Sequence, residues 1–340
     1  MAFSVSEFVS KSWYQGAYWL YLLWPLSLLY CVVTYLRKYL YRYRVFKSYR
    51  AKVPVVVVGN ITIGGTGKSP LVAHLVKSLK EIGLKPGVVS RGYGANILPN
   101  EVREVLIVSL ACDGGDEPLV LKLNGDCPIF VSPTRSLAVQ ALEAKGCNII
   151  ITDDGLQHYA LERDIEVCVF DGQRKWGNGY LLPMGPMRES LSRVHNTDFV
   201  VMNGADWLEQ IQPKEAAFRM DLDIGDLHAL NDHETLAVTA LKGIKVDAIA
   251  GIGNPTRFFN TLAGEGLLVE SHGFNDHHAY SLSDVSFNTG RPLLMTEKDA
   301  VKCRRLNLKE AWYLPVSAKL SGDLAAHIVT ALKSKGWFNG

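Results

Sequence analysis

The six cysteines of this chain have none of the spacings that bind a metal ion or form a disulfide framework. The sequence contains no Cys-x-x-Cys pair and no group of histidines near a cysteine, which argues against a structural zinc site and a disulfide-stabilised fold. Internal repeats and low-complexity tracts are also missing. We therefore expect reduced cysteines that serve mostly as small apolar side chains in a globular protein.

The chain also lacks a strong net charge. Its formal charge is +2, with 21% charged and 48% hydrophobic residues. Averaged over the chain, this charge indicates no particular partner, and we expect neither nucleic acid nor an obligate protein partner. The length of 340 residues favours two domains over one, because a single core rarely grows past about 250 residues.

Charged residues and histidine are absent altogether from residues 12–36. Residues 17–36 alone would form about 30 Å of helix, which is enough to cross the hydrocarbon core of a membrane. Seven cations and no acid follow in residues 37–52, and this places the rest of the chain in the cytoplasm. Pro25 and the many Trp and Tyr side chains suit a helix in the headgroup layer, so spanning and interfacial helices both stay open. A helix buried in a soluble core is the third possibility, and the neighbouring cations argue against it.

A glycine-rich loop at residues 59–69 is the strongest indication of function. The four valines before it predict a buried strand, and the apolar spacing after Lys68 predicts a helix. In this context Gly-Lys-Ser is typical of a phosphate-binding loop, although a purely structural turn is the alternative. The general pattern expects glycine where this chain has Thr62. Gly64 and Gly65 should therefore supply the positive φ angles of the turn.

The same loop predicts which residues hold a nucleotide. Backbone N–H groups and the positive end of the following helix bind phosphate oxygens, and a lysine neutralises their charge. The phosphate-binding residues are expected to be Thr62, Ile63, Gly64, Gly65, Thr66, Gly67, Lys68 and Ser69. The hydroxyl of Ser69 can also ligate a divalent cation.

Strands and helices alternate after this loop. We predict strands at 87–90, 105–108, 128–131 and 148–152, and a helix at 134–145. This alternation is typical of a mostly parallel sheet with helices on both faces. Ligands in such sheets bind at the carboxyl ends of the strands.

Three carboxylate-bearing loops lie in this part of the chain. Asp153 and Asp154 follow the strand at 148–152, where a P-loop protein holds Mg²⁺. By itself an Asp-Asp-Gly sequence is more often a turn, but its place after a P-loop favours the metal site. The loops at 114–118 and 185–189 are either solvated turns or sources of a base for a substrate hydroxyl.

The second half of the chain predicts a smaller α/β unit. The run at 199–202 closes the first sheet, and the segment from 212 to 245 is polar and less regular. Further strands are expected at 246–252, 267–269, 292–295 and 312–314, and helices at 256–262 and 323–332. The predicted division is an N-terminal membrane helix and basic arm (1–52), a P-loop kinase domain (53–212), a linker region (213–245) and a smaller α/β domain (246–340).

Six short motifs occur together in this chain. They are GNITIGGTGKSP at 59–70, SRGYG at 90–94, GDEP at 115–118, TDDGLQH at 152–158, Phe274 with Asp276-His277, and MTEKDAVK at 295–302. In this order they resemble the tetraacyldisaccharide 4′-kinase family of lipid A biosynthesis. The resemblance runs from the N-terminal apolar segment to near the C-terminus. Thr62 fits it, because this family carries a hydroxyl residue at that point.

The resemblance implies a lipid kinase. Such an enzyme uses ATP and Mg²⁺ to phosphorylate the 4′-hydroxyl of a tetraacylated glucosamine disaccharide 1-phosphate. It is bound to the cytoplasmic face of the inner membrane of a Gram-negative bacterium, and its two α/β domains are joined by a short β linker.

The resemblance also implies roles for individual residues. Asp116 matches the proposed general base, and His277 matches the histidine paired with it, although a histidine taken by itself is more often a surface or core residue. Lys68 binds ATP phosphates. Asp153 and Asp154 match the metal-site pair, with Asp154 favoured as the nearer ligand. Four residues in family-like motifs are expected to line the active site, namely Arg91, Gln157, Arg188 and Glu189.

Two other classes of function fit parts of the sequence. A membrane-tethered P-loop ATPase or switch would act on a protein partner, although the chain has no Asn-Lys-x-Asp motif for guanine. A non-catalytic nucleotide-binding scaffold would need the loop but not Asp116.

Overall fold

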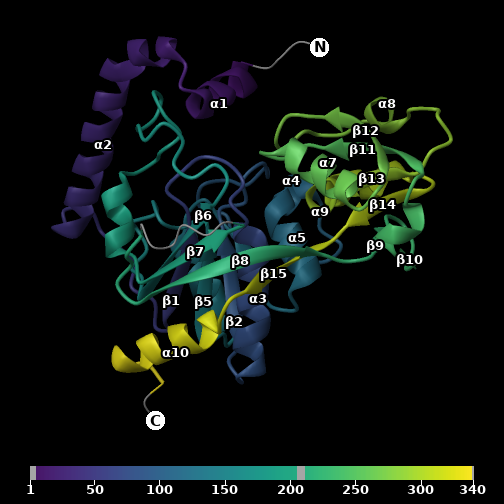
Figure 1. The fold of residues 1–340 in the computed structure, drawn as a ribbon. Helices are drawn as coiled ribbons and strands as arrows, with labels where there is room; N and C mark the ends of the chain where they lie inside the picture. Colours follow the sequence, from purple (N-terminus) through teal and green to yellow (C-terminus); the bar gives the residue numbers. More distant parts are fainter. Residues whose placement is uncertain (1–4, 205–210, 339–340) are drawn as a thin grey trace.

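The computed structural model describes residues 5–204 and 211–338. Three short parts of the predicted regions therefore lie outside the described residues: 1–4 of the N-terminal segment, 205–210 of the kinase domain and 339–340 of the C-terminal domain. The described chain forms two β-sheets, with an N-terminal helical segment beside the first (Figure 1).

The first sheet has nine strands in the order β15-β8-β7-β6-β1-β5-β2-β4-β3. In chain order they are β1 (Val55–Gly59), β2 (Pro86–Ser90), β3 (Arg103–Glu104), β4 (Ile129–Val131), β5 (Ile149–Asp153), β6 (Ile165–Asp171), β7 (Phe199–Asn203), β8 (Ala216–Ile224) and β15 (Val316–Leu320). Only the outermost strands, β3 and β15, pair antiparallel with their neighbours. The predicted, mostly parallel sheet is confirmed.

Helices cover both faces of this sheet, as predicted. The helices α3 (Lys68–Glu81) and α5 (Asp116–Asn124) contribute buried side chains to one core cluster. The helix α6 (Arg135–Ala144) contributes to the cluster on the opposite face. Because β1 and β5 are buried on both faces, their valines and isoleucines form the centre of the domain.

Two expectations for this sheet need correction. The strand predicted at 105–108 is wrong, because the edge strand is β3, two residues earlier. Val105 fills the core, but Leu106 to Val108 lie exposed in the following turn. Only the first side chain of this apolar run is buried, so the run does not form a strand of its own. In addition, β6 lies between β1 and β7 and was not predicted.

The chain returns to the first sheet near its C-terminus, which changes the predicted division. Within the predicted linker 213–245, β8 pairs parallel with β7. Later, β15 pairs antiparallel with β8, and α10 (Leu324–Ser334) packs into the core of the first sheet. The segment of β8 looked irregular in sequence because buried Phe218 and Met220 alternate with outward polar side chains.

The second sheet has six strands in the order β10-β9-β14-β13-β11-β12. They are β9 (Leu227–Ala229), β10 (Thr235–Leu236), β11 (Lys245–Ala250), β12 (Leu268–Gly273), β13 (Leu293–Thr296) and β14 (Ala311–Leu314). Its helices are α7 (Pro255–Gly264), α8 (Leu282–Val285) and α9 (Glu297–Cys303), and the four strands predicted here are confirmed. The short helix α4 (Ala111–Gly114) belongs to the part of the chain that forms the first sheet, where it follows β3 and leads through Gly115 into α5.

The N-terminal segment is helical but not one continuous helix. It comprises α1 (Val5–Gln15), a 3₁₀ turn η1 (Tyr18–Leu23) and α2 (Trp24–Arg42). Pro25 stands in the first turn of α2, where its missing N–H costs nothing. Among the described residues, the stretch Tyr18–Arg42 has the length and composition to cross a membrane, and only 11% of its apolar window is buried. Its side chains nevertheless bond the first domain, because Ser27 donates to Leu181 O at 2.7 Å.

Candidate active site

The glycine-rich loop leaves the carboxyl end of β1 and enters α3 at Lys68. Gly64 and Gly67 have positive φ angles of 110° and 89°. The expectation for Gly65 was therefore wrong, since the turn uses Gly67 instead. At Gly67 a Cβ would also lie 2.6 Å from Nδ2 of Asn203, so only glycine fits. Thr62 is buried and forms an isolated antiparallel bridge with Met187.

Two carboxylates meet this loop at the end of β5. Lys68 Nζ lies 3.6 Å from Asp154 Oδ1. Arg188 Nη1 donates to both oxygens of Asp154, at 3.0 and 2.9 Å. Although burial alone would raise it, Lys68 and Arg188 lower the pKa of Asp154 to about 2. Asp154 is therefore an ionised carboxylate already paired with two cations.

Asp153 is in a different environment. It is buried, and neither of its side-chain oxygens has a hydrogen-bond partner. Burial, together with the charges of Glu117 and Asp154, raises the pKa of Asp153 to about 7. An unpaired buried carboxylate is costly unless another group binds it.

The donor groups here fit Mg²⁺. A cation would satisfy the two unpartnered oxygens of Asp153, and Ser69 supplies a hydroxyl in the first turn of α3. Within the described ranges no group of three or more His, Cys, Asp or Glu side chains is arranged to hold a metal alone. That pattern agrees with Mg²⁺, which commonly takes one or two carboxylates and completes its shell with substrate phosphates and water.

Asp116 and His277 are in contact, although they belong to the two parts of the chain that form different sheets. Asp116 begins α5, and His277 lies in the loop after β12 with a φ of 61°. The His277 Nδ1 lies 2.9 and 3.1 Å from the two Asp116 oxygens. Burial acts to raise the pKa of Asp116, but His277 and Lys298 lower it overall. The carboxylate is therefore ionised at neutral pH.

Lys298 completes this cluster and was not predicted. It stands in the first turn of α9, and its Nζ lies 3.0 Å from Asp276 Oδ1 and 3.3 Å from Glu117 Oε1. The same ammonium lies 3.4 Å from His277 Nε2. An ammonium can only donate, so Nε2 accepts and the ring proton is on Nδ1, where it is donated to Asp116. The carboxylates raise the pKa of Lys298 despite its burial.

The four predicted lining residues separate into two groups. Gln157 Nε2 donates to Glu189 Oε1 at 2.9 Å and to Asn60 O at 3.1 Å, at the base of the glycine-rich loop. Arg188 joins this network through Asp154, and Tyr30 of α2 donates to its carbonyl oxygen at 3.2 Å. These contacts link the network to the N-terminal helix.

Arg91 has no hydrogen bond or ion pair with the described residues of this network, so its position does not assign it a role. It follows β2 and is exposed. Two further residues that sequence reasoning missed are Tyr93, whose ring centroid lies 4.7 Å from that of His277, and Arg135. Arg135 is buried and donates to the carbonyl oxygens of both Asp153 and Asp154. Its position at the start of α6 gives no local signal of this contact.

Comparisons with known proteins agree with this geometry. The profile of the family described as tetraacyldisaccharide-1-P 4′-kinase matches residues 19–333. The chain is 43% identical to the tetraacyldisaccharide 4′-kinase of Methylobacillus flagellatus, over 98% of each chain. It is 46% identical to the corresponding protein of Aeromonas salmonicida, over 96% of this chain and 97% of the other.

A solved structure also resembles the fold. The "apo" form of LpxK from Aquifex aeolicus in complex with ATP matches with a TM-score of 0.76 and 26% identity. The match covers 93% of this chain and 98% of the Aquifex chain.

Lys298 provides a prediction about stability. Lys298→Met would leave Asp116, Glu117 and Asp276 without their shared cation, at a cost of about 1–3 kcal/mol at pH 7 after discounting for the half-exposed partners. The lowered pKa of Asp116 means that its contribution is present above the unfolded pKa and lost as pH falls through the folded pKa. Urea unfolding should therefore show a smaller loss at about pH 2, below the ordinary aspartate pKa, than at pH 7.

Lys319→Met is the matched control, because Lys319 is an exposed lysine on β15. Equal losses for Lys298→Met at both pH values would contradict the electrostatic role of Lys298.

Proposed function

The chain belongs to the tetraacyldisaccharide-1-P 4′-kinase family and is an ATP-dependent lipid A 4′-kinase, and from this premise we propose which of its residues carry out the transfer. The observation that carries the proposal is the Asp116–His277 contact between the two sheets. The same family membership argues against the protein-directed ATPase and the non-catalytic scaffold.

Asp116 is the proposed acceptor of the substrate proton. The 4′-hydroxyl oxygen forms a bond to the γ-phosphorus of ATP, the bond from that phosphorus to the β,γ-bridging oxygen breaks, and ADP leaves. The hydroxyl proton passes to Asp116. Phosphoryl transfer has a loose transition state in most analyses, so a carboxylate of low pKa suffices to orient the hydroxyl and take its proton late. His277 then positions this carboxylate.

The glycine-rich loop is the proposed donor site. Loop N–H groups and the start of α3 face the ATP phosphates, and Lys68 neutralises their charge. Ser69 and Asp153 are proposed to hold Mg²⁺, which would neutralise charge that develops on the transferred phosphoryl group. The unpaired oxygens of Asp153 support it as the nearer ligand, since the Asp154 oxygens already bond Arg188. Which of the two binds Mg²⁺ directly stays a prediction.

We further propose that α2 lies in the headgroup layer on the cytoplasmic face of the inner membrane. Its inner side is tied to the first domain by Ser27 and Tyr30, which supports a helix lying along the surface rather than crossing it. Its outer side exposes Leu29 and Val33, one turn apart. The basic segment that begins in the last turns of α2 supports contact with anionic lipid.

The first test concerns the base. Asp116→Asn should lower kcat by roughly 10²-fold or more, because proton transfer by a positioned side chain contributes about that much. The Kd for ATP should stay unchanged, since Asp116 lies outside the glycine-rich loop. Turnover of purified protein on the tetraacyldisaccharide 1-phosphate is measured, with the new phosphate mapped by mass spectrometry.

Asp126→Asn, at an exposed aspartate just beyond the C-terminal end of α5, is the control. If Asp116→Asn turns over as fast as the wild-type protein, Asp116 is not the base. If the wild-type protein phosphorylates the lipid at a position other than 4′, the proposed transfer is wrong.

The second test concerns the metal. In Asp153→Asn a neutral amide replaces the carboxylate, so Mg²⁺ should no longer strengthen ATP binding by the several-fold expected for wild type. Calorimetric titration with ATP, with and without Mg²⁺, measures this directly and needs no turnover. If the Mg²⁺ enhancement survives in Asp153→Asn but is lost in Asp154→Asn, the assignment to Asp153 is wrong.

The third test concerns the membrane. The double change Leu29→Glu and Val33→Glu should release most of the protein from sedimenting vesicles that contain anionic phospholipid, because two charges would replace apolar side chains that insert into the headgroup layer. Leu268→Glu, at an exposed leucine of β12, is the control and should change nothing. Equal vesicle binding by all three proteins would show that α2 does not make the contact.

A further inference from the structure

A buried amide connects the first sheet to the glycine-rich loop. Asn203 is the last residue of β7, and its Nδ2 donates to Thr66 O at 3.1 Å. The peptide unit that carries this oxygen also carries the Gly67 N–H, which points the opposite way because the unit is planar and trans. Asn203 therefore sets the direction of one N–H group of the glycine-rich loop, next to Lys68.

The orientation of this amide is set in turn by Arg257, which belongs to the part of the chain that forms the second sheet. Arg257 lies in the first turn of α7, and its Nη2 donates to Asn203 Oδ1 at 3.1 Å. A guanidinium can only donate hydrogen bonds, so the amide oxygen faces Arg257 and the amino group is left for Thr66 O. Arg257 Nη1 lies 3.9 Å from Asp171 Oδ2, and the other oxygen of this buried carboxylate accepts from two backbone N–H groups. Arg257 thus contacts the ends of both β6 and β7.

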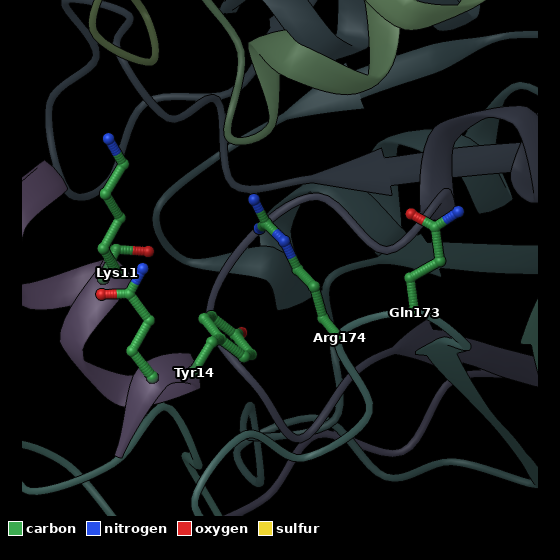
Figure 2. Close-up of a pocket in the computed structure, with 6 residues that line it drawn as sticks. Lys11, Tyr14, Gln173 and Arg174 are labelled. Carbon is green, nitrogen blue, oxygen red and sulfur yellow. The ribbon is translucent and has the colours of Figure 1, made fainter. Parts of the chain in front are cut away.

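The loop between β11 and α7 lies against the glycine-rich loop beside this contact. A Cβ at Gly253 would lie 3.1 Å from Gly65 N. Gly253 O accepts from Arg174 Nη2 at 2.9 Å, and in Figure 2 the Arg174 side chain extends toward the green ribbon of this part of the chain. The Arg174 guanidinium also packs against Tyr14 of α1, at 5.5 Å from the ring centre, and a Cβ at Gly64 would lie 3.0 Å from its Nη1. The start of α7 is therefore held directly beside the phosphate-binding residues.

We propose that Arg257 is a positioning residue for the ATP phosphates. It holds the Asn203 amide with its amino group toward Thr66 O, and so aligns the Gly67 N–H for a phosphate oxygen. The inference rests on the proposed function, which places the ATP phosphates on the glycine-rich loop. Because α7 packs with the second sheet, full affinity for ATP then depends on the docking of that part of the chain, although the loop itself follows a strand of the first sheet.

The first measurement is the Kd for ATP in the presence of Mg²⁺, by calorimetric titration of the full-length protein. Arg257→Met should raise this Kd roughly 3- to 10-fold, the range for the loss of one hydrogen bond. Arg257→Lys keeps a donor for the amide oxygen and should restore most of the affinity. The KM for the acceptor lipid should stay unchanged in both variants. Arg305→Met, at an exposed arginine in the 3₁₀ turn η5 (Arg304–Leu306), is the control and should bind ATP like wild type.

A double-mutant cycle separates this role from a general loss of structure. Asn203→Leu keeps the size of the side chain and removes both hydrogen bonds of the amide, so it should weaken ATP binding at least as much as Arg257→Met. The combined variant should bind ATP about as weakly as Asn203→Leu alone, because Arg257 acts through the amide. A residue that only stabilised the fold would instead lower the thermal midpoint and add its effect to that of Asn203→Leu.

Three results would overturn the proposal: an unchanged Kd in Arg257→Met, losses that multiply in the combined variant, or a KM for the acceptor that rises as much as the Kd for ATP. Should Arg257→Met fail to fold, Arg257→Gln, which is too short to reach the amide, takes its place with the same expected outcomes. Lys68→Ala tests the premise. If this variant binds ATP like wild type, the glycine-rich loop is not the donor site and the proposed function fails, which is distinct from a loop that depends on Lys68 but not on Arg257.

Discussion

The contact between the Asp116 carboxylate and the His277 ring is the constraint to which the rest of the site conforms. The two residues are 161 positions apart, at the start of α5 and in the loop after β12, so the contact forms only when the two parts of the chain meet beside the glycine-rich loop. Lys298 holds the meeting point through Glu117 and Asp276. Close by, a Cβ at Gly253 would lie 3.1 Å from Gly65 N, so the second part of the chain also reaches the phosphate-binding loop itself.

The parts of the fold that local patterns could predict are the ones with uniform burial. The buried valines of β1 and the helical spacing of α3 predicted that the glycine-rich loop connects a strand to a helix, and the structure confirms this. The prediction of secondary structure and domain bounds failed where only one face of a strand is buried, or where elements distant in the sequence pack together. The alternating strand β8 looked like a linker, and no short-range signal tells that α10 packs on a sheet begun more than 250 residues earlier.

The site divides in the same way. Motifs identified Lys68, Asp116 and His277 because their roles depend on residue type and order. Lys298 lay within a quoted motif, yet only the structure brings its ammonium to three carboxylates at once. Arg174 belonged to no motif considered, since its position between α1, the glycine-rich loop and Gly253 is a product of tertiary packing. Likewise, charge alone could not separate Asp153 from Asp154, whereas the hydrogen bonds of Arg188 do distinguish their environments.

The central claim is that Asp116 and His277 act as one unit in phosphoryl transfer. A double-mutant cycle on the single-turnover rate tests it, using Asp116→Asn, His277→Ala and the combined variant, with ATP saturating. Residues that act as a unit are strongly non-additive, so the double variant should be about as slow as Asp116→Asn alone. Losses that multiply, with the double variant slower by the product of the two single effects, would contradict the account.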